Sequence, residues 1–457
     1  MTDTPTPHTC LRVIPLLLLA GTAAAQAPQQ VVTPPKVMLW MDVSTGGMAG
    51  MPEFDMPGMG GLMGGLAGAM GKGGPGARNT NREYYGAART FHMTPPRILD
   101  VALWNGLKPG VEAEQRVPPG LKLGDKLPLL PVIEDKVVES KESGGPTDYE
   151  APKGRILFYW GCSATIRPGK PRILDLSKLS AGSAASFGSA FSGRFAPDRG
   201  ARVRTGYDVF PNERDQRGLP RDASLVGEHQ VVGDSVPAYF RLNLGPAQDV
   251  MPPIELQSQG SLKDSVALSW IPVTNAKAYF LHAMGAQGDD MIFWSSSDVP
   301  DTGFGLFDYL SNGTIDKWIA EKVILGTGVT QCAVPKGIFA ARDGASTRGR
   351  DHAGAMLRMV AYGGEHGFVH PPRPGDAKIP WNQEWSVRLR VKSQTMAMLG
   401  EDTGQQAGTR RSESRSNTRG SGAEESGDRT DPSDDSKSSN KIQLPNPASL
   451  LKGLFGR

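Results

Sequence analysis

Six methionines recur in a Gly-rich stretch near the N-terminus, and their thioethers are the most distinctive chemistry in the chain. The residues are Met48, Met51, Met56, Met59, Met63 and Met70. Thioether sulfur is a soft ligand that suits Cu(I). The spacings Met48-x-x-Met51 and Met56-x-x-Met59 therefore predict chelation of Cu(I) by a flexible loop as one alternative. Low-complexity sequence drift would produce the same letters without any metal.

Two histidines near the C-terminal third are a second candidate metal group. His366 and His370 lie four residues apart, with Glu365 and His352 nearby. Imidazole is a common ligand of transition metals. The surrounding Gly and Pro residues instead predict a loop in which the imidazoles are solvated. We expect no bound cofactor.

Other motifs match catalytic patterns only in their letters. Gly233-Asp234-Ser235 matches the serine motif of one esterase group, but that motif needs the serine at the start of a helix. The Gly71-x-Gly73-x-x-Gly76 pattern lacks the strand–turn–helix unit of a dinucleotide site. Asp289 and Asp290 are adjacent in a predicted turn, where carboxylates are usually solvated. We therefore predict no catalytic residue.

The N-terminus predicts an exported protein. Val13–Ala20 is an apolar core behind Arg12, followed by small-x-small cleavage sites that end at Ala25 or Ala27. This run is shorter than the roughly 20 apolar residues that span a bilayer. We expect a signal peptide over 1–27 and no transmembrane segment in the mature chain, which would be periplasmic or extracellular.

Two cysteines, Cys162 and Cys332, follow the predicted cleavage site. In an oxidising compartment they can form a disulfide. Such a bridge would close a very long loop, worth about 4–5 kcal/mol in the chain-entropy model. Two separate buried thiols are the alternative.

The charge balance argues against nucleic acid as a partner. The 457 residues carry 50 Lys and Arg against 47 Asp and Glu, a formal net charge of +3. Nucleic-acid binders concentrate basic charge far more strongly. High Gly and Pro content favours β-structure and turns.

Period-two alternation of apolar residues predicts a mainly β fold. It is clearest in 265–297, where three strands follow one another between turns and suggest one antiparallel sheet. Further strands are expected at Val37–Val43, Ile98–Trp104, Arg155–Trp160, Pro171–Leu176, Leu225–Val232, Ala238–Leu244, Val329–Val334, Ala355–Tyr362 and Trp385–Lys392. Trp385–Lys392 has a basic face, which predicts a solvent-facing strand protected against edge pairing. One helix is expected over Thr314–Leu325, capped by Asn312 or Thr314.

Composition divides the chain into two β-rich, sandwich-like domains and a tail. The first spans 31–245, with the Gly/Met-rich loop over 44–77, and the second spans 251–399. Residues 401–440 lack aromatics and almost all aliphatics, which predicts disorder. Residues 441–457 form an apolar tip that can dock to a partner or remain a floppy terminus.

The second domain resembles a fibronectin type III module over about residues 251–395. The resemblance rests on Leu268-Ser269-Trp270 with Pro272, on Ala278-Tyr279, on Leu357–Ala361 and on Trp385–Lys392. It implies a two-sheet sandwich with the Trp and the Tyr packed inside. Such modules mostly act as spacers and binding surfaces. The whole chain is also similar to exported bacterial proteins.

These features favour a non-catalytic binding or scaffold protein of the bacterial cell envelope. Its expected partner is an envelope protein or a surface ligand. One alternative is an envelope hydrolase with a site between the two domains. The other is a Met-rich Cu(I)-binding protein.

Overall fold

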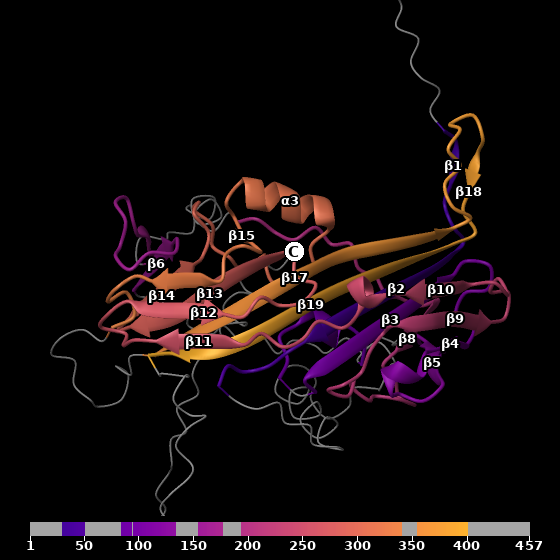
Figure 1. The fold of residues 1–457 in the computed structure, drawn as a ribbon, viewed down its shortest axis with the longest axis horizontal. Coiled ribbons are helices and arrows are strands. Elements are labelled where there is room, and N and C mark those ends of the chain that lie inside the picture. The colour runs from indigo at the N-terminus through magenta and orange to yellow at the C-terminus, as the bar shows by residue number, and fades with distance from the viewer. Residues whose placement is uncertain are drawn as a thin grey trace, which may run out of the picture. The chain divides into compact units, whose positions relative to one another are not determined.

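The computed structural model confirms a mainly β fold (Figure 1). It describes residues 30–50, 84–93, 95–133, 154–176, 193–340 and 354–400. The predicted signal peptide, most of the Gly/Met-rich loop, the tail over 401–440 and the tip over 441–457 lie outside these ranges. The α-helix among the described residues, α3 (Asn312–Ala320), is nine residues long. No helix in the described ranges has the length and apolar character needed to cross a membrane.

Most strands join one 14-stranded sheet, whose path runs β10-β9-β4-β5-β8-β3-β2-β19-β17-β13-β14-β6-β7, with β15 paired to β13. Their bounds are β2 Val37–Thr45, β3 Arg97–Asn105, β4 Ala113–Arg116, β5 Lys126–Pro131, β6 Arg155–Trp160, β7 Arg172–Asp175, β8 Tyr207–Phe210, β9 Gly227–Gly233, β10 Arg241–Leu244, β13 Ala278–Gln287, β14 Asp290–Ser295, β15 Leu325–Gly326, β17 Ala355–His370 and β19 Trp385–Leu399. Two short strands, β1 (Val32–Thr33) and β18 (Trp381–Asn382), pair separately.

A second sheet of three strands contains β11 (Leu256–Gln259), β12 (Val266–Trp270) and β16 (Gln331–Val334). The prediction of one sheet over 265–297 was therefore wrong in part. β13 and β14 do pair antiparallel, but β12 pairs with β11 and β16. Trp270 on β12 packs edge-on against Tyr279 on β13, with ring centroids 5.5 Å apart. The small sheet thus covers part of one face of the large sheet.

Alternate residues of the central strands build the main apolar core. Leu39, Val101, Leu281, Leu357 and Leu389 are each at most 1% exposed and belong to one cluster that also includes the small sheet. Burial of such side chains contributes about 1.5–3 kcal/mol each. The period-two alternation of β2, β3, β13, β17 and β19 is therefore explained by this shared face.

A disulfide joins Cys162, just after β6, to Cys332 on β16. It links the large sheet to the small sheet across 170 residues of sequence. In the chain-entropy model a loop of this length is worth about 5 kcal/mol.

Strands from both predicted domains share the large sheet. β2 pairs in parallel with β19, and β6 pairs in parallel with β14. The described residues all fall within one compact unit, and the predicted boundary between 245 and 251 lies inside it.

Three predicted elements have different bounds or positions in the structure. β19 continues to Leu399 and lies between β17 and β2, so the prediction of a solvent-facing basic strand was wrong. β17 continues through the predicted loop to His370, because Gly364 takes a positive φ of 87° at a bulge. The helix begins two residues earlier than expected and ends at Ala320; Ser311 caps it by accepting the Thr314 N–H.

Candidate functional site

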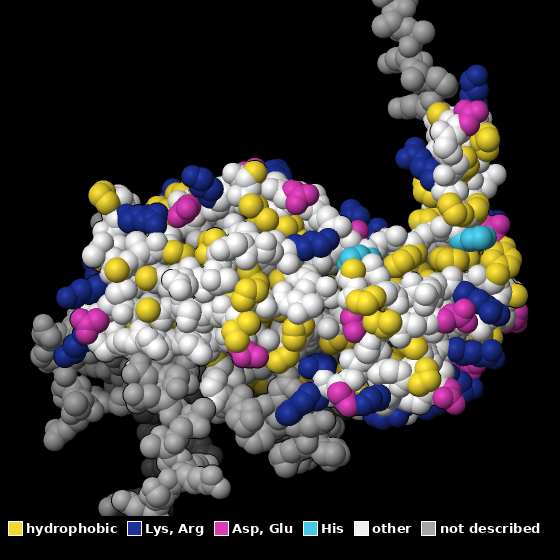
Figure 2. Space-filling model, in the orientation of Figure 1, with side chains coloured by type: hydrophobic (Ala, Val, Ile, Leu, Met, Phe, Trp, Pro, Cys, Tyr) yellow, Lys and Arg dark blue, Asp and Glu magenta, His cyan; other side chains and the backbone are white. Residues whose placement is uncertain are grey.

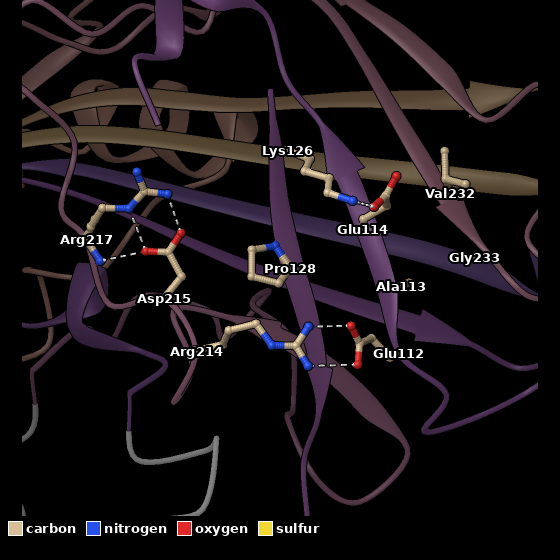
Figure 3. Close-up of a pocket in the computed structure, with 10 residues that line it drawn as sticks. All are labelled: Glu112, Ala113, Glu114, Lys126, Pro128, Arg214, Asp215, Arg217, Val232 and Gly233. Carbon is tan, nitrogen blue, oxygen red and sulfur yellow. Dashed lines mark hydrogen bonds and ion pairs between the residues drawn. The ribbon is translucent and has the colours of Figure 1, made fainter. Parts of the chain in front are cut away.

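An open hollow of about 490 Å³ lies over β4, β5 and β9 (Figure 3). Pro128 and Val232 provide apolar surface, and charged side chains surround them. The loop after β8 supplies Arg214, Asp215 and Arg217. Asn212 fixes this loop, because its side-chain NH₂ donates to Pro128 O and Val209 O, each at 2.7 Å.

Each carboxylate of the hollow is paired with a cation. Arg214 donates to both Glu112 oxygens, at 2.5 and 3.1 Å. Lys126 Nζ lies 2.6 Å from Glu114 Oε2. Arg217 binds Asp215 through two nitrogens, at 2.9 and 2.6 Å. Figure 3 shows the three pairs arranged around Pro128.

This pairing decides what the hollow can do chemically. The hydrogen bond from Arg214 lowers the pKa of Glu112, and the hydrogen bond from Lys126 lowers that of Glu114. A carboxylate with a lowered pKa is a poor general base at neutral pH. The hollow instead offers fixed charges of both signs beside an apolar floor, which suits recognition of a zwitterionic or polar surface. It lies wholly within 112–233, not between the two predicted domains.

A projecting arm is formed by β1, β18 and the connection 371–380 (Figure 1). The backbone N–H of Trp381 donates to Val31 O at 2.8 Å, and the Gln30 side chain donates to Ile379 O at 2.9 Å. Val31, Val32 and Ile379 on this arm are 66%, 47% and 52% exposed. The arm therefore presents aliphatic side chains to solvent while its backbone is hydrogen-bonded (Figure 2).

An aromatic stack supports the base of the arm. Phe240 stacks on Trp385 with centroids 4.5 Å apart, and Trp385 stacks on His370 at 5.4 Å. His370 then packs against Tyr239 at 5.2 Å. Stacked rings of this kind contribute about 0.5–1.5 kcal/mol per pair beyond their buried area. They hold the ends of β17 and β19 together where the arm begins.

A charged section lies on the sheet face opposite the main core; we define it as Asp42, Asp100, Arg390 and Lys392. Arg390, Asp42 and Asp100 are in register on three adjacent strands. Arg390 binds Asp42 through Nε at 2.7 Å and Nη2 at 2.5 Å, and each side chain is 1% exposed. Tyr309 lies against both cations, with its ring centre 4.6 Å from Arg390 and 4.7 Å from Lys392.

Two covering segments supply the remaining partners of the charged section. Backbone N–H groups of Ala88 and Gly86 donate to Asp100 at 2.8 and 3.1 Å. Lys392 donates to Arg89 O at 3.1 Å and to Phe307 O at 3.0 Å. Burial raises the pKa of Asp100 to about 8 and lowers the pKa of Lys392 to about 7. These groups are enclosed and mostly hydrogen-bonded, although Asp100 Oδ1 and Arg390 Nη1 have no hydrogen-bond partner among the described residues. Their burial indicates a structural role.

The two candidate histidine ligands lie apart on one strand. His366 and His370 lie four residues apart on β17, a separation of roughly 13 Å along a strand. His366 is half-buried and burial lowers its pKa, whereas His370 belongs to the aromatic stack. Met48 is described, but Met51, Met56 and Met59 lie outside the described residues. In the described ranges, no three His, Cys, Asp or Glu side chains are grouped to hold a metal.

Sequence reasoning missed both the hollow and the charged section. The hollow pairs residues about 100 positions apart in sequence, such as Arg214 with Glu112. One signal for the charged section was present, because Asp42 interrupts the otherwise apolar run of Val37–Val43. A carboxyl group there predicts a buried partner, either a cation or hydrogen-bond donors. Comparisons of the chain with protein-family models, with curated proteins and with solved structures find no match.

Proposed function

We propose that this chain is an exported, non-catalytic binding or scaffold protein of the bacterial cell envelope, and that its arm engages a partner protein. The observation that carries the proposal is the exposure of Val31, Val32 and Ile379 on a projecting, hydrogen-bonded element. Solvent-exposed aliphatic groups gathered in one place are typical of interaction sites. The partner surface that fits them is an apolar groove.

The construction of the arm supports this proposal. Arg373 donates to Gln30 Oε1 at 2.8 Å, and its guanidinium lies 5.6 Å from the ring centre of Trp381. Trp381 in turn donates to Pro371 O at 2.8 Å. A pre-ordered element loses less conformational entropy on binding. Its apolar side chains are therefore ready to bind without a folding step.

Two further observations support export and a sandwich-based scaffold. The Cys162–Cys332 disulfide is the chemistry of an oxidising compartment. The antiparallel pairings β11-β12-β16 and β14-β13-β17-β19 put two sheets face to face over Trp270 and Tyr279. Such a sandwich is what a fibronectin type III-like module would require.

The binding experiment compares two isoleucines of equal exposure. Ile379 on the arm and Ile173 on β7 are each 52% exposed. Full-length protein with Ile379→Ser should lose a cross-linked envelope partner that the wild type and Ile173→Ser both retain. Equal capture by all three proteins would contradict a role for the arm. The intact mass after alkylation, with and without reductant, tests export and the disulfide in the same preparation.

A further inference from the structure

Three methionines form a continuous row across three strands of the large sheet. Met398 on β19 is in register with Met356 on β17, and Met356 is in register with Met284 on β13. Side chains of directly paired residues lie on the same face, with Cβ atoms about 4.5–5.5 Å apart. Phe293 and Phe158 continue the same row. The three thioethers are therefore neighbours by backbone register alone.

Two more methionines adjoin this row. Met396 lies two residues before Met398 on the same face of β19, and an isolated parallel bridge pairs it with Met48. We call Met48, Met284, Met356, Met396 and Met398 the methionine section. Met398 is 43% exposed and the other four are half-buried. These methionines are thus at least partly exposed to solvent, unlike the core residue Met41.

The surroundings of the row are soft and apolar. From Met398 to Phe158, no side chain in the row carries an oxygen or nitrogen atom. In the next row, Arg358 lies between Met396 and His282. The Arg358 guanidinium lies 4.1 Å from the ring centre of Phe307 and 5.3 Å from that of Phe91, so ring faces already engage its charge.

We infer that Met284, Met356 and Met398 form a binding site for a soft monovalent metal ion, Cu(I) in the cell envelope. Thioether ligands select Cu(I) over the harder divalent ions. Methionine has three rotatable side-chain bonds, which allow neighbouring sulfurs to converge on one ion. Binding forms metal–sulfur bonds only and involves no electron transfer. The site is independent of the arm, and its three proposed ligands include none of Met48, Met51, Met56 and Met59, the methionines that the sequence suggested.

The test uses Ag(I), a soft monovalent ion that needs no reductant and so leaves the disulfide intact. Isothermal titration calorimetry of the full-length protein in chloride-free buffer should show one Ag(I) ion bound tightly per chain. Met284→Leu/Met356→Leu/Met398→Leu should weaken this binding by more than about 10-fold, since even the loss of a ligand's supporting partner costs 10–100-fold. Leucine conserves the volume, and the melting temperature reports on folding.

Two control variants locate the ion. Met93→Leu removes a methionine of matched exposure, 46% against 43% for Met398. This variant should still bind one Ag(I) ion tightly. Met51→Leu/Met56→Leu/Met59→Leu should also bind it tightly. Retention of tight binding by the Met284/Met356/Met398 variant would overturn the inference. So would its loss in the Met51/Met56/Met59 variant, or a wild type that binds no Ag(I).

Discussion

One strand, β19, contributes residues to both the charged section and the methionine section, and these residues lie on the same face. Arg390 and Lys392 come first, and Met396 and Met398 follow at the same period of two. Over the charged half, the chain around Ala88 and Phe307 provides donors, acceptors and ring faces, so that charge is buried at 1% exposure. Over the methionine half the side chains stay half-exposed. The difference teaches that identical alternation can build a closed structural unit or an accessible surface.

The charged section should be the more sensitive of the two regions. Arg390→Met leaves Asp42 buried without its cation, and removal of one partner of a buried pair destabilises by about 3–5 kcal/mol. Urea unfolding followed by tryptophan fluorescence measures the change. Ag(I) binding by the folded fraction should be unaffected, because Arg390 lies outside the methionine section. A loss below about 1 kcal/mol would show that the pair adds little.

Asp100 should make stability depend on pH. Because burial raises its pKa to about 8, the folded state keeps a proton that the unfolded state loses above pH 4. Wild-type stability attributable to this group therefore falls as pH rises from about 4 to about 8. Relative to the wild type, the free energy of unfolding of Asp100→Asn should therefore increase across that window, by up to about 1.4 kcal/mol per pH unit.

Lys392 is the matched control, because it should make stability change with pH in the opposite direction. Its lowered pKa of about 7 means that the unfolded state binds the extra proton above pH 7. Wild-type stability from this group rises between pH 7 and about 10, so any advantage of Lys392→Met should shrink there. Unfolding at pH 5, 7 and 9 distinguishes the two slopes. Parallel profiles for wild type and both variants would contradict the assignment.

The methionine section should show the smallest stability effect. Met356→Leu/Met398→Leu keeps volume and apolarity, and such swaps usually cost less than about 1.5 kcal/mol. Metal-free unfolding should therefore differ little from the wild type. A loss as large as that of Arg390→Met would show that this section also holds the fold, and would remove the contrast between the two regions.

The sequence predicted the apolar side of the sheet well. The apolar runs Val37–Val43, Ile98–Trp104 and Arg155–Trp160 predicted strands that match β2, β3 and β6 closely. These predictions worked because one shared core imposes the period of two on each strand. β4 and β5 were missed, since Pro and Gly punctuate that part of the chain and Glu114 and Arg116 alternate with few apolar residues.

The other side of the sheet could not be predicted in the same way. A row of Arg and Lys on one strand face is usually solvated, and nothing near Trp385–Lys392 in sequence indicates a cover. The cover comes from segments about 80 and 300 residues away, at Phe307 and Arg89. The methionine row depends likewise on the register of three distant strands. The period-two pattern of a strand shows which of its faces packs on the main core. It does not show whether a loop from a distant part of the sequence covers the other face.

A double-mutant cycle on Asp42 and Arg390 tests the central claim most directly, that this buried ion pair of the charged section stabilises the fold. The free energy of unfolding is measured for wild type, Asp42→Leu, Arg390→Met and the double variant. We predict that the double variant is more stable than either single variant, because no buried charge is left unpaired. Losses that simply add, within about 0.5 kcal/mol, would contradict the claim.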